Sequence, residues 1–309
     1  MLKTAFVFPG QGSQYVGMGK DLYEGNTQAK ALFSKADEVL GFSLSKICFY
    51  GPEEELRHTK NTQPAIFLHS VVLFTLMKNR KFEMAAGHSL GEYSALVAAG
   101  ALSFEDGLKL VRLRGELMQQ AGVEQPGIMA AIVGLDTKTV NGICAEASPA
   151  GIVQAANFNS PGQIVVSGSV TGVRKAMELA KTRGAKIVKE LPVSGAFHSP
   201  LMESAQAGLK EVLDRTEIRD AAVSVYANVT ARPVRHADEI RSLLYRQLTS
   251  PVRWEESVAN MVADGATIFT EIGPGKVLQG LVKRINGNVQ TCGFEKLDDV
   301  AVTDGISNK

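Results

Sequence analysis

Residues 84–99 read MAAGHSLGEYSALVAA: a short apolar segment, a serine between two glycines, and a helical pattern. Within it, GHSLG at 87–91 fits G-x-S-x-G, the strand-to-helix turn that exposes a serine hydroxyl at the end of a sheet. The first N–H groups of such a helix, and its partial positive charge, suit a developing oxyanion. Because so short a pattern also occurs by chance, Ser89 is either a nucleophile or part of an ordinary turn.

Strand-like and helical segments alternate on both sides of this turn. Residues 4–8 form an apolar run ended by Pro-Gly, as in a strand buried on both faces. Pro64 stands where a first-turn proline would begin a helix. Helical patterns are also expected at 21–40, 104–121 and 276–284, and strands at 85–88, 223–227 and 266–271. This alternation predicts an α/β fold with a mostly parallel, doubly wound sheet.

The middle of the chain has a different rhythm. Its segments follow the order β-α-β-β-α-β, which is typical of a ferredoxin-like unit. The expected strands are 127–134, 151–157, 163–167 and 185–190, and the expected helices are 137–147 and 170–183. We therefore expect a large α/β domain over 1–124 and 196–309, with a small ferredoxin-like subdomain inserted at 125–195. The tail after about residue 297 is expected to be frayed.

Composition excludes several classes of protein. The 309 residues are 45% hydrophobic and 21% charged, with 33 basic and 32 acidic side chains and a net charge of +1. Such a balance gives no support for binding nucleic acid or a membrane surface. No apolar run has the length of a membrane span, and three scattered cysteines suggest neither disulfides nor a metal site. We expect a cytoplasmic, reduced protein without metal or cofactor.

A serine is a weak nucleophile unless a base takes its proton. His58 and His236 stand among charged residues and are expected in solvent, whereas His69 lies in an apolar helical segment as a core residue. His88 adjoins the serine, but neighbouring side chains of an extended chain point to opposite faces. His198, in the loop-like GAFHSPLM, remains the candidate base by elimination, with a structural role as the alternative.

Three further segments have both functional and structural interpretations. FPGQGSQYVGMG (8–19) is glycine-rich but lacks the third glycine of a dinucleotide fingerprint and the Lys-Ser/Thr pair of a phosphate loop. Gln11 either offers its N–H to the site or belongs to a turn. Arg114 is either exposed or buried towards a cleft, where it would bind a carboxylate or phosphate bidentately. For EIGPGKVL (271–278) we prefer a structural role.

Together these motifs resemble the malonyl-CoA:acyl carrier protein transacylases. The match covers nearly the whole chain in order and spacing. It runs through FPGQGSQ (8–14), TQPA (62–65), GHSLGEY (87–93), RLRGELM (112–118), NSPGQ (159–163), GAFHSPLM (195–202) and EIGPGKVL (271–278). The resemblance implies a hydrolase-like core with a ferredoxin-like insertion, which agrees with the segmentation above.

The resemblance implies a role for each matching residue at the reacting centre. Ser89 would carry the malonyl group, His198 would take its proton, and Arg114 would clamp the free carboxylate. The backbone N–H groups of Gln11 and Leu90 would form the oxyanion hole.

It also implies roles for residues around this centre. The backbone carbonyl of Gln247, in RQLTSPVRW, would orient the histidine, in place of a carboxylate. Gln63, Met118 and Phe197 would line the acyl pocket. Leu90 and Phe197 resemble malonyl-selective members, whereas methylmalonyl-selective relatives tend to carry Gln and Ser there.

The implied activity is a ping-pong transfer from malonyl-CoA to the phosphopantetheine thiol of holo acyl carrier protein, for fatty acid synthesis. The carrier protein is acidic in this family, so a basic rim is expected on the enzyme, which we expect to be a monomer. Candidates on the insertion are Lys181, Arg183, Lys186 and Lys189, although for any one of them a solvated charged face is the favoured interpretation. A serine hydrolase, either thioesterase or esterase, and a catalytically idle carrier-protein-binding module are the alternatives.

Overall fold

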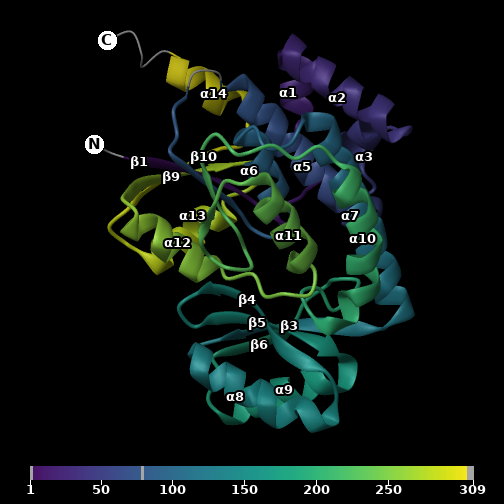
Figure 1. Cartoon of the computed structure of the whole chain (residues 1–309), viewed down its shortest axis with the longest axis vertical. Coiled ribbons are helices and arrows are strands. Elements are labelled where there is room, and N and C mark those ends of the chain that lie inside the picture. The colour runs from purple at the N-terminus through teal and green to yellow at the C-terminus, as the bar shows by residue number, and fades with distance from the viewer. Residues whose placement is uncertain (1–2, 78–79, 305–309) are drawn as a thin grey trace.

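A computed structural model describes residues 3–77 and 80–304, which form two sheets surrounded by helices (Figure 1). The strands are β1 (Lys3–Phe8), β2 (Met84–Gly87), β3 (Gly127–Val133), β4 (Val153–Ser160), β5 (Gln163–Ser169), β6 (Ile187–Glu190), β7 (Ser224–Tyr226), β8 (Pro233–Val234), β9 (Ala266–Ile272) and β10 (Gln290–Phe294). None of the described helices is long and apolar enough to cross a membrane.

The helices connect the strands and cover both sheets. They are α1 (Lys20–Gly25), α2 (Thr27–Leu40), α3 (Leu44–Tyr50), α4 (Glu53–Arg57), α5 (Thr59–Leu76), α6 (Gly91–Ala98), α7 (Phe104–Glu124), α8 (Thr137–Ala147), α9 (Val170–Thr182), α10 (Glu203–Arg215), α11 (Ala237–Gln247), α12 (Trp254–Ala263), α13 (Val277–Ile285) and α14 (Leu297–Asp304), with short 3₁₀ turns at Ser148–Ala150 and Pro200–Met202. The tail expected to be frayed is thus helical as far as Asp304, and residues 305–309 lie outside the described part.

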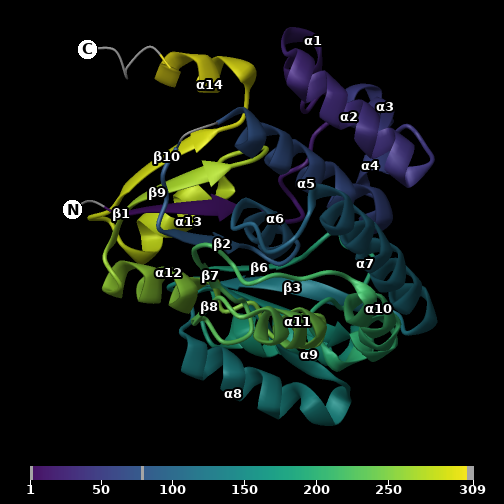
Figure 2. The ribbon, with the colours of Figure 1, turned by 45° about the horizontal axis from the view of Figure 1, so that its top comes forward.

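The large sheet has the order β10-β9-β1-β2-β7-β8, and its strands can be followed side by side in Figure 2. All neighbouring pairs are parallel except β7 and β8. In the pair β1–β2, Phe8 lies opposite Gly87, so the two strands end at the same edge. The chain leaving each strand therefore begins at this edge, where open α/β sheets usually bind ligands.

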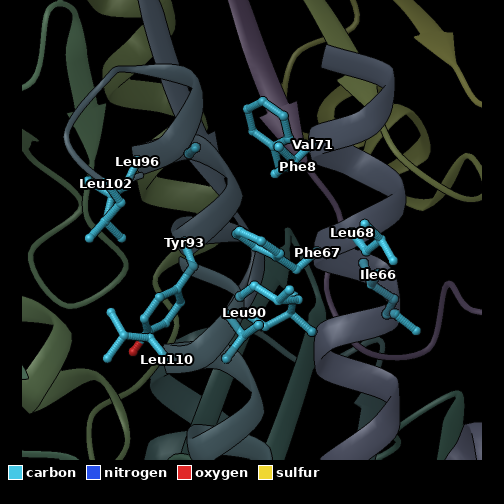
Figure 3. Close-up of a cluster of buried hydrophobic side chains, with 14 of the residues drawn as sticks. Phe8, Ile66, Phe67, Leu68, Val71, Leu90, Tyr93, Leu96, Leu102 and Leu110 are labelled. Carbon is cyan, nitrogen blue, oxygen red and sulfur yellow. The ribbon is translucent and has the colours of Figure 1, made fainter. Parts of the chain in front are cut away.

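Alternate residues of β1 enter different cores, because successive side chains of a strand point to opposite faces. Ala5 and Val7 pack in a cluster with residues of α12 and α13. Phe6 and Phe8 belong to the larger cluster formed with α5, α6 and α7. Figure 3 shows Phe8 among side chains of the helices in this larger cluster. Burial on both faces confirms the predicted doubly wound sheet.

The second sheet is antiparallel, with the order β4-β5-β3-β6. This is the strand order of a ferredoxin-like unit, and α8 and α9 cover one of its faces (Figure 1). On the other face, Met129 and Val165 pack against the core of the large domain. Backbone hydrogen bonds of Val252 with Ala156 and Phe158 join β4 to the large domain. The predicted fold class is confirmed, and we propose residues 125–195 as the bounds of the subdomain.

Helix α5 begins at Thr59, so the prediction that Pro64 would begin it is wrong. Inside a helix, a proline cannot donate to the carbonyl four residues earlier, here that of Lys60. The Lys60 carbonyl instead accepts a hydrogen bond of 2.9 Å from Arg112 Nη1, which also donates to Asn61 Oδ1 at 2.8 Å. The proline is tolerated because a side chain of α7 satisfies the carbonyl that it leaves free.

The turn between β2 and α6 needs both of its glycines because backbone segments meet there. A Cβ on Gly87 would lie 1.9 Å from the backbone carbon of Gly91. A Cβ on Gly91 would lie 2.2 Å from the carbonyl oxygen of Phe8. The two glycines therefore let α6 start directly against the ends of β1 and β2.

Replacing Gly87 with alanine should strongly destabilise the fold. Because the neighbouring atoms belong to the backbone, they cannot move aside as a flexible side chain can. We therefore expect Gly87→Ala to lower the free energy of unfolding by about 3 kcal/mol or more. Urea denaturation followed by circular dichroism measures this loss. Gly280→Ala on α13 is the control: its Cβ would meet nothing within 4 Å, so about 0.5–1 kcal/mol of stabilisation is expected. Equal stability of the two variants would contradict the close approach.

Candidate active site

Ser89 lies two residues after the end of β2 and has a left-handed backbone, with φ of 53°. Such a conformation costs a non-glycine residue about 1–3 kcal/mol and needs support from its surroundings. The Ser89 N–H donates to Asn228 Oδ1 at 2.7 Å, and the Ser89 carbonyl accepts from Gln247 Nε2 at 3.1 Å. Two side-chain amides therefore hold the strained turn that presents the hydroxyl.

His198 lies in the loop after β6, and its ring faces this hydroxyl. Its Nε2 is 2.8 Å from Ser89 Oγ, while its Nδ1 is 2.9 Å from the Gln247 carbonyl oxygen and 3.2 Å from that of Ser250. Since carbonyls only accept hydrogen bonds, Nδ1 carries the proton and Nε2 is free to accept the serine proton. His198 is also left-handed, with φ of 58°. Burial, and next the charge of Arg114, lower its pKa to about 3.

Arg114 is buried on α7, with 1% of its surface exposed. Its Nη1 donates to Gln63 Oε1 at 2.7 Å, and its Nη2 donates to Gln247 Oε1 and Ser89 Oγ, both at 3.0 Å. Among the described residues, no carboxylate forms an ion pair with it. A buried cation held only by neutral oxygens can accept an anionic ligand as its missing partner.

These three side chains line one cavity of about 160 Å³. The loop after β1, the turn after β2, α5, α7 and the inner face of the small sheet all contribute to its wall. Its lining includes Gln11, Gln63, Ser89, Leu90, Arg114, Met118, Phe197 and His198, together with Met129, Asn157, Val165, Leu191 and Val193. Of the nine residues singled out above, eight thus lie at the cavity, and Gln247 contacts it through His198, Arg114 and Ser89.

The acyl transferase domain family matches residues 5–293. This chain belongs to that family. It is 51% identical over 294 residues to the malonyl CoA-acyl carrier protein transacylase of Bacillus subtilis (strain 168), covering 94% of this chain and 93% of the relative. The crystal structure of an acyl carrier protein S-malonyltransferase from Vibrio cholerae superposes with a TM-score of 0.94 at 42% identity, covering 97% of this chain and 99% of that one. A malonyl-transacylase solved in complex with a type II PKS acyl-carrier protein has a TM-score of 0.94 at 40% identity, over 97% and 98% of the chains.

Two backbone N–H groups of this acyl transferase lie beside the cavity without a hydrogen-bond acceptor among the described residues. Gln11 follows the end of β1, and Leu90 precedes the first residue of α6. No hydrogen bond among the described residues uses the N–H of Gln11 or of Leu90. Both residues line the cavity beside Ser89, while the Leu90 side chain packs in the core shown in Figure 3.

The other histidines take no part in the contact with Ser89. His88 donates or accepts a hydrogen bond of 2.8 Å with Asn159 Oδ1, and burial lowers its pKa. His236 is exposed beside Asp220, whereas His58, which was expected in solvent, is only partly exposed beside Glu55. His69 is buried, as expected, but neither ring nitrogen has a hydrogen-bond partner among the described residues. Burial lowers the pKa of His69 to about 4, which keeps its ring uncharged.

Two residues of the acyl transferase site escaped the sequence analysis. Glu92 is buried behind Ser89, and burial raises its pKa to about 7. Asn228 follows β7, donating to the Gly87 carbonyl at 2.7 Å as well as holding Ser89. Glu92 could have been found from its position three residues after the serine. Asn228 could not, because an asparagine after a short strand is too common to indicate a function. No group of three or more His, Cys, Asp or Glu residues that could hold a metal ion occurs in the described part.

Proposed function

We propose that the chain transfers a malonyl group from malonyl-CoA to the phosphopantetheine thiol of an acyl carrier protein, through an ester on Ser89. The observation that carries the proposal is the single cavity in which Ser89 Oγ lies 2.8 Å from His198 Nε2 and 3.0 Å from Arg114 Nη2. Relatives with 44–51% identity are malonyl CoA-acyl carrier protein transacylases. The chain is an S-malonyltransferase of this kind.

In the first half-reaction, Ser89 Oγ attacks the thioester carbonyl while its proton passes to His198 Nε2. The N–H groups of Gln11 and Leu90 donate to the oxyanion that forms. Collapse of this intermediate breaks the carbon–sulfur bond, and the leaving thiolate of CoA takes the proton from His198. The enzyme is left as a malonyl ester, and the number of bound protons is unchanged.

In the second half-reaction, the carrier-protein thiol attacks the ester carbonyl. His198 accepts the thiol proton and returns it to Ser89 Oγ as the ester breaks. The carbonyls of Gln247 and Ser250, which accept from Nδ1–H, keep the ring in the orientation that both steps need. A backbone carbonyl thus replaces the carboxylate found in most serine hydrolases.

Specificity for the carboxylated acyl group comes from Arg114. A malonyl carboxylate would give the buried guanidinium a charged, bidentate partner, whereas an acetyl group would leave it without one. Gln63, Met118 and Phe197 line the same cavity as Arg114. Gln63 contributes by fixing Arg114, to which its Oε1 is bonded, and its Nε2 lies 3.3 Å from the Met118 sulfur.

One experiment separates this function from hydrolysis. The enzyme is mixed with malonyl-CoA alone, and CoA release is followed together with intact-protein mass. A transferase releases about one equivalent of CoA and stops as a stable malonyl-enzyme, because its second substrate is missing. Continued release would mean a thioesterase. If neither CoA release nor a mass gain is seen, the protein is a catalytically idle carrier-protein-binding module.

The rate of malonyl loading should not fall around the ordinary pKa of a histidine. The base must be neutral, and a pKa of about 3 keeps His198 neutral until the pH approaches that value. Activity is therefore lost only as pH falls through the lowered pKa, and we expect no decrease from about pH 7 to about pH 5. Stopped-flow measurement of CoA release gives the profile. A rate that halves near pH 6.5 would contradict the buried, desolvated base.

The carrier-protein surface remains a prediction. The candidates Lys181, Arg183, Lys186 and Lys189 are exposed on the small subdomain. Arg183 is already paired with Glu146, while Lys189 lies two residues before the cavity-lining Leu191. The acidity of the carrier protein, the monomeric state and the cytoplasmic location also stay predictions.

A further inference from the structure

Glu92 is a buried carboxyl group that the reaction described above does not use. It lies in the first turn of α6, and 3% of its surface is exposed. One of its oxygens, Oε2, accepts two hydrogen bonds: from the Asn228 N–H at 2.9 Å and from Gln247 Nε2 at 2.8 Å. A carboxyl group is costly to bury without a function or strong pairing.

The two residues that bind Glu92 also hold the nucleophile. Asn228 accepts from the Ser89 N–H, and Gln247 donates to the Ser89 carbonyl. Both backbone polar groups of the strained serine are thus bonded to side chains of residues that also bind Glu92 Oε2: Gln247 through the same Nε2, and Asn228 through its backbone N–H. The carboxyl group is therefore connected to the reacting centre through two short hydrogen-bonded paths.

Gln247 also connects Glu92 with Arg114. Its Nε2 donates to Glu92 Oε2, while its Oε1 accepts from Arg114 Nη2 at 3.0 Å. The amide dipole therefore lies between the carboxylate and the guanidinium with its donor and acceptor ends matched to them. The charge of Glu92 acts on Arg114 across this amide, although the two groups form no direct ion pair.

Few charges surround Glu92. The elements packed against α6 are β1, β2, β7, α5 and α7. Among the described residues, Arg114 on α7 is the charged group that acts on Glu92, and it lowers the pKa of the carboxyl group against the larger, raising effect of burial. The other titratable groups buried on these elements and in the cavity have pKa values that burial shifts towards the uncharged form: Tyr93, His69, Tyr226, His88 and His198. The same elements also carry charged side chains, none of which is buried: Lys3, Lys60, Glu105, Asp106, Lys109, Arg112, Glu116 and Glu124.

We infer that Glu92 is a positioning residue whose charge competes with the substrate carboxylate for Arg114, so that malonyl loading of Ser89 is favoured when Glu92 is protonated. The inference rests on the proposed function. A malonyl carboxylate brings a second negative charge to one buried guanidinium, whereas an acetyl group brings none. Acyl transfer itself leaves the proton count unchanged, so the proton taken up by Glu92 comes from solvent.

The size and direction of the effect follow from charge repulsion. Two like charges on opposite sides of one guanidinium, at an effective dielectric constant of about 20, change an equilibrium constant by about tenfold. Glu92 has a pKa of about 7. The ratio of malonyl to acetyl loading should therefore be highest below this pKa and fall about tenfold between about pH 6 and about pH 9. Both substrates release the same CoA thiol, so its ionisation affects both loading reactions equally and cancels in the ratio of malonyl to acetyl loading.

Glu92→Gln tests this coupling. The amide oxygen can accept the same two hydrogen bonds that Oε2 accepts, but the side chain carries no charge. Loading of Ser89 is measured by intact-protein mass spectrometry after brief exposure to malonyl-CoA or acetyl-CoA across this pH range. We expect the ratio in the variant to be independent of pH and equal to the low-pH value of the wild type. Glu116→Gln on α7, which removes a partly exposed partner of Arg112, should follow the wild type.

A second measurement needs no variant. In weakly buffered solution near the pKa of Glu92, an indicator dye should report net proton uptake when the wild type is loaded from malonyl-CoA, and none from acetyl-CoA. Equal proton uptake with both substrates, or the same pH dependence in wild type and Glu92→Gln, overturns the inference. A wild type that forms no malonyl ester at all would instead contradict the proposed function.

Discussion

Ser89→Ala is expected to abolish malonyl-enzyme formation and to lower the overall transfer rate by at least about 10⁴-fold. The alanine has a Cβ as serine does, so the left-handed backbone and its bonds to Asn228 and Gln247 can remain. What disappears is the oxygen that faces His198 Nε2. Intact-protein mass spectrometry after exposure to malonyl-CoA measures the ester, and carrier-protein malonylation measures the transfer.

Ser94→Ala is the matched control for this variant. Ser94 lies on the same helix, and its buried hydroxyl has no hydrogen-bond partner among the described residues. Its removal should leave loading unchanged. A malonyl ester that still formed on Ser89→Ala would place the nucleophile elsewhere and would end the mechanism proposed here.

Arg114→Ala is expected to lower malonyl loading by about 30-fold to several thousand-fold. Removing one partner of a buried charged pair costs about 2–5 kcal/mol. Each loss of about 1.4 kcal/mol of transition-state stabilisation lowers the rate about tenfold, which gives this range. An acetyl group has no carboxylate for the guanidinium to bind, so the preference for malonyl over acetyl should fall by a similar factor. Competition between the two CoA esters, followed by mass spectrometry, measures this preference.

Lys109→Ala removes a cation from the exposed side of the same helix and should change neither rate. Thermal unfolding of both variants checks that the fold persists, since Arg114 also bonds Gln63 and Gln247. A malonyl preference that survived Arg114→Ala would show that another group recognises the carboxylate.

The local features of this site could be predicted from the sequence. The glycines around Ser89, the strand before it and the helix after it are properties of neighbouring residues, and the structure places them as expected. The order of segments between 125 and 195 likewise predicted a ferredoxin-like sheet, because hydrophobic periodicity follows the local geometry of strands and helices. Elimination among five histidines selected His198, which lies beside the serine.

Other features depended on contacts between distant segments. Pro64 could be internal to α5 only because Arg112, on another helix, satisfies a carbonyl. Whether Arg114 is exposed or buried could not be decided from its own helix, since α5 and the last residue of α11 supply its hydrogen-bond partners. Glu92 went unnoticed for the same reason: its pKa is set by burial and by groups far along the chain.

By itself, the sequence determined the alternation of elements, the turn that exposes a serine and the motifs of an acyl transferase. Only the tertiary structure decided which polar groups share one cavity, and therefore which are charged, which are neutral and which lack a partner. The physical reason is that hydrophobic periodicity and glycine geometry act over a few residues. Desolvation and hydrogen-bond pairing, which set the chemistry of serine, histidine, arginine and glutamate here, depend on segments more than a hundred residues apart.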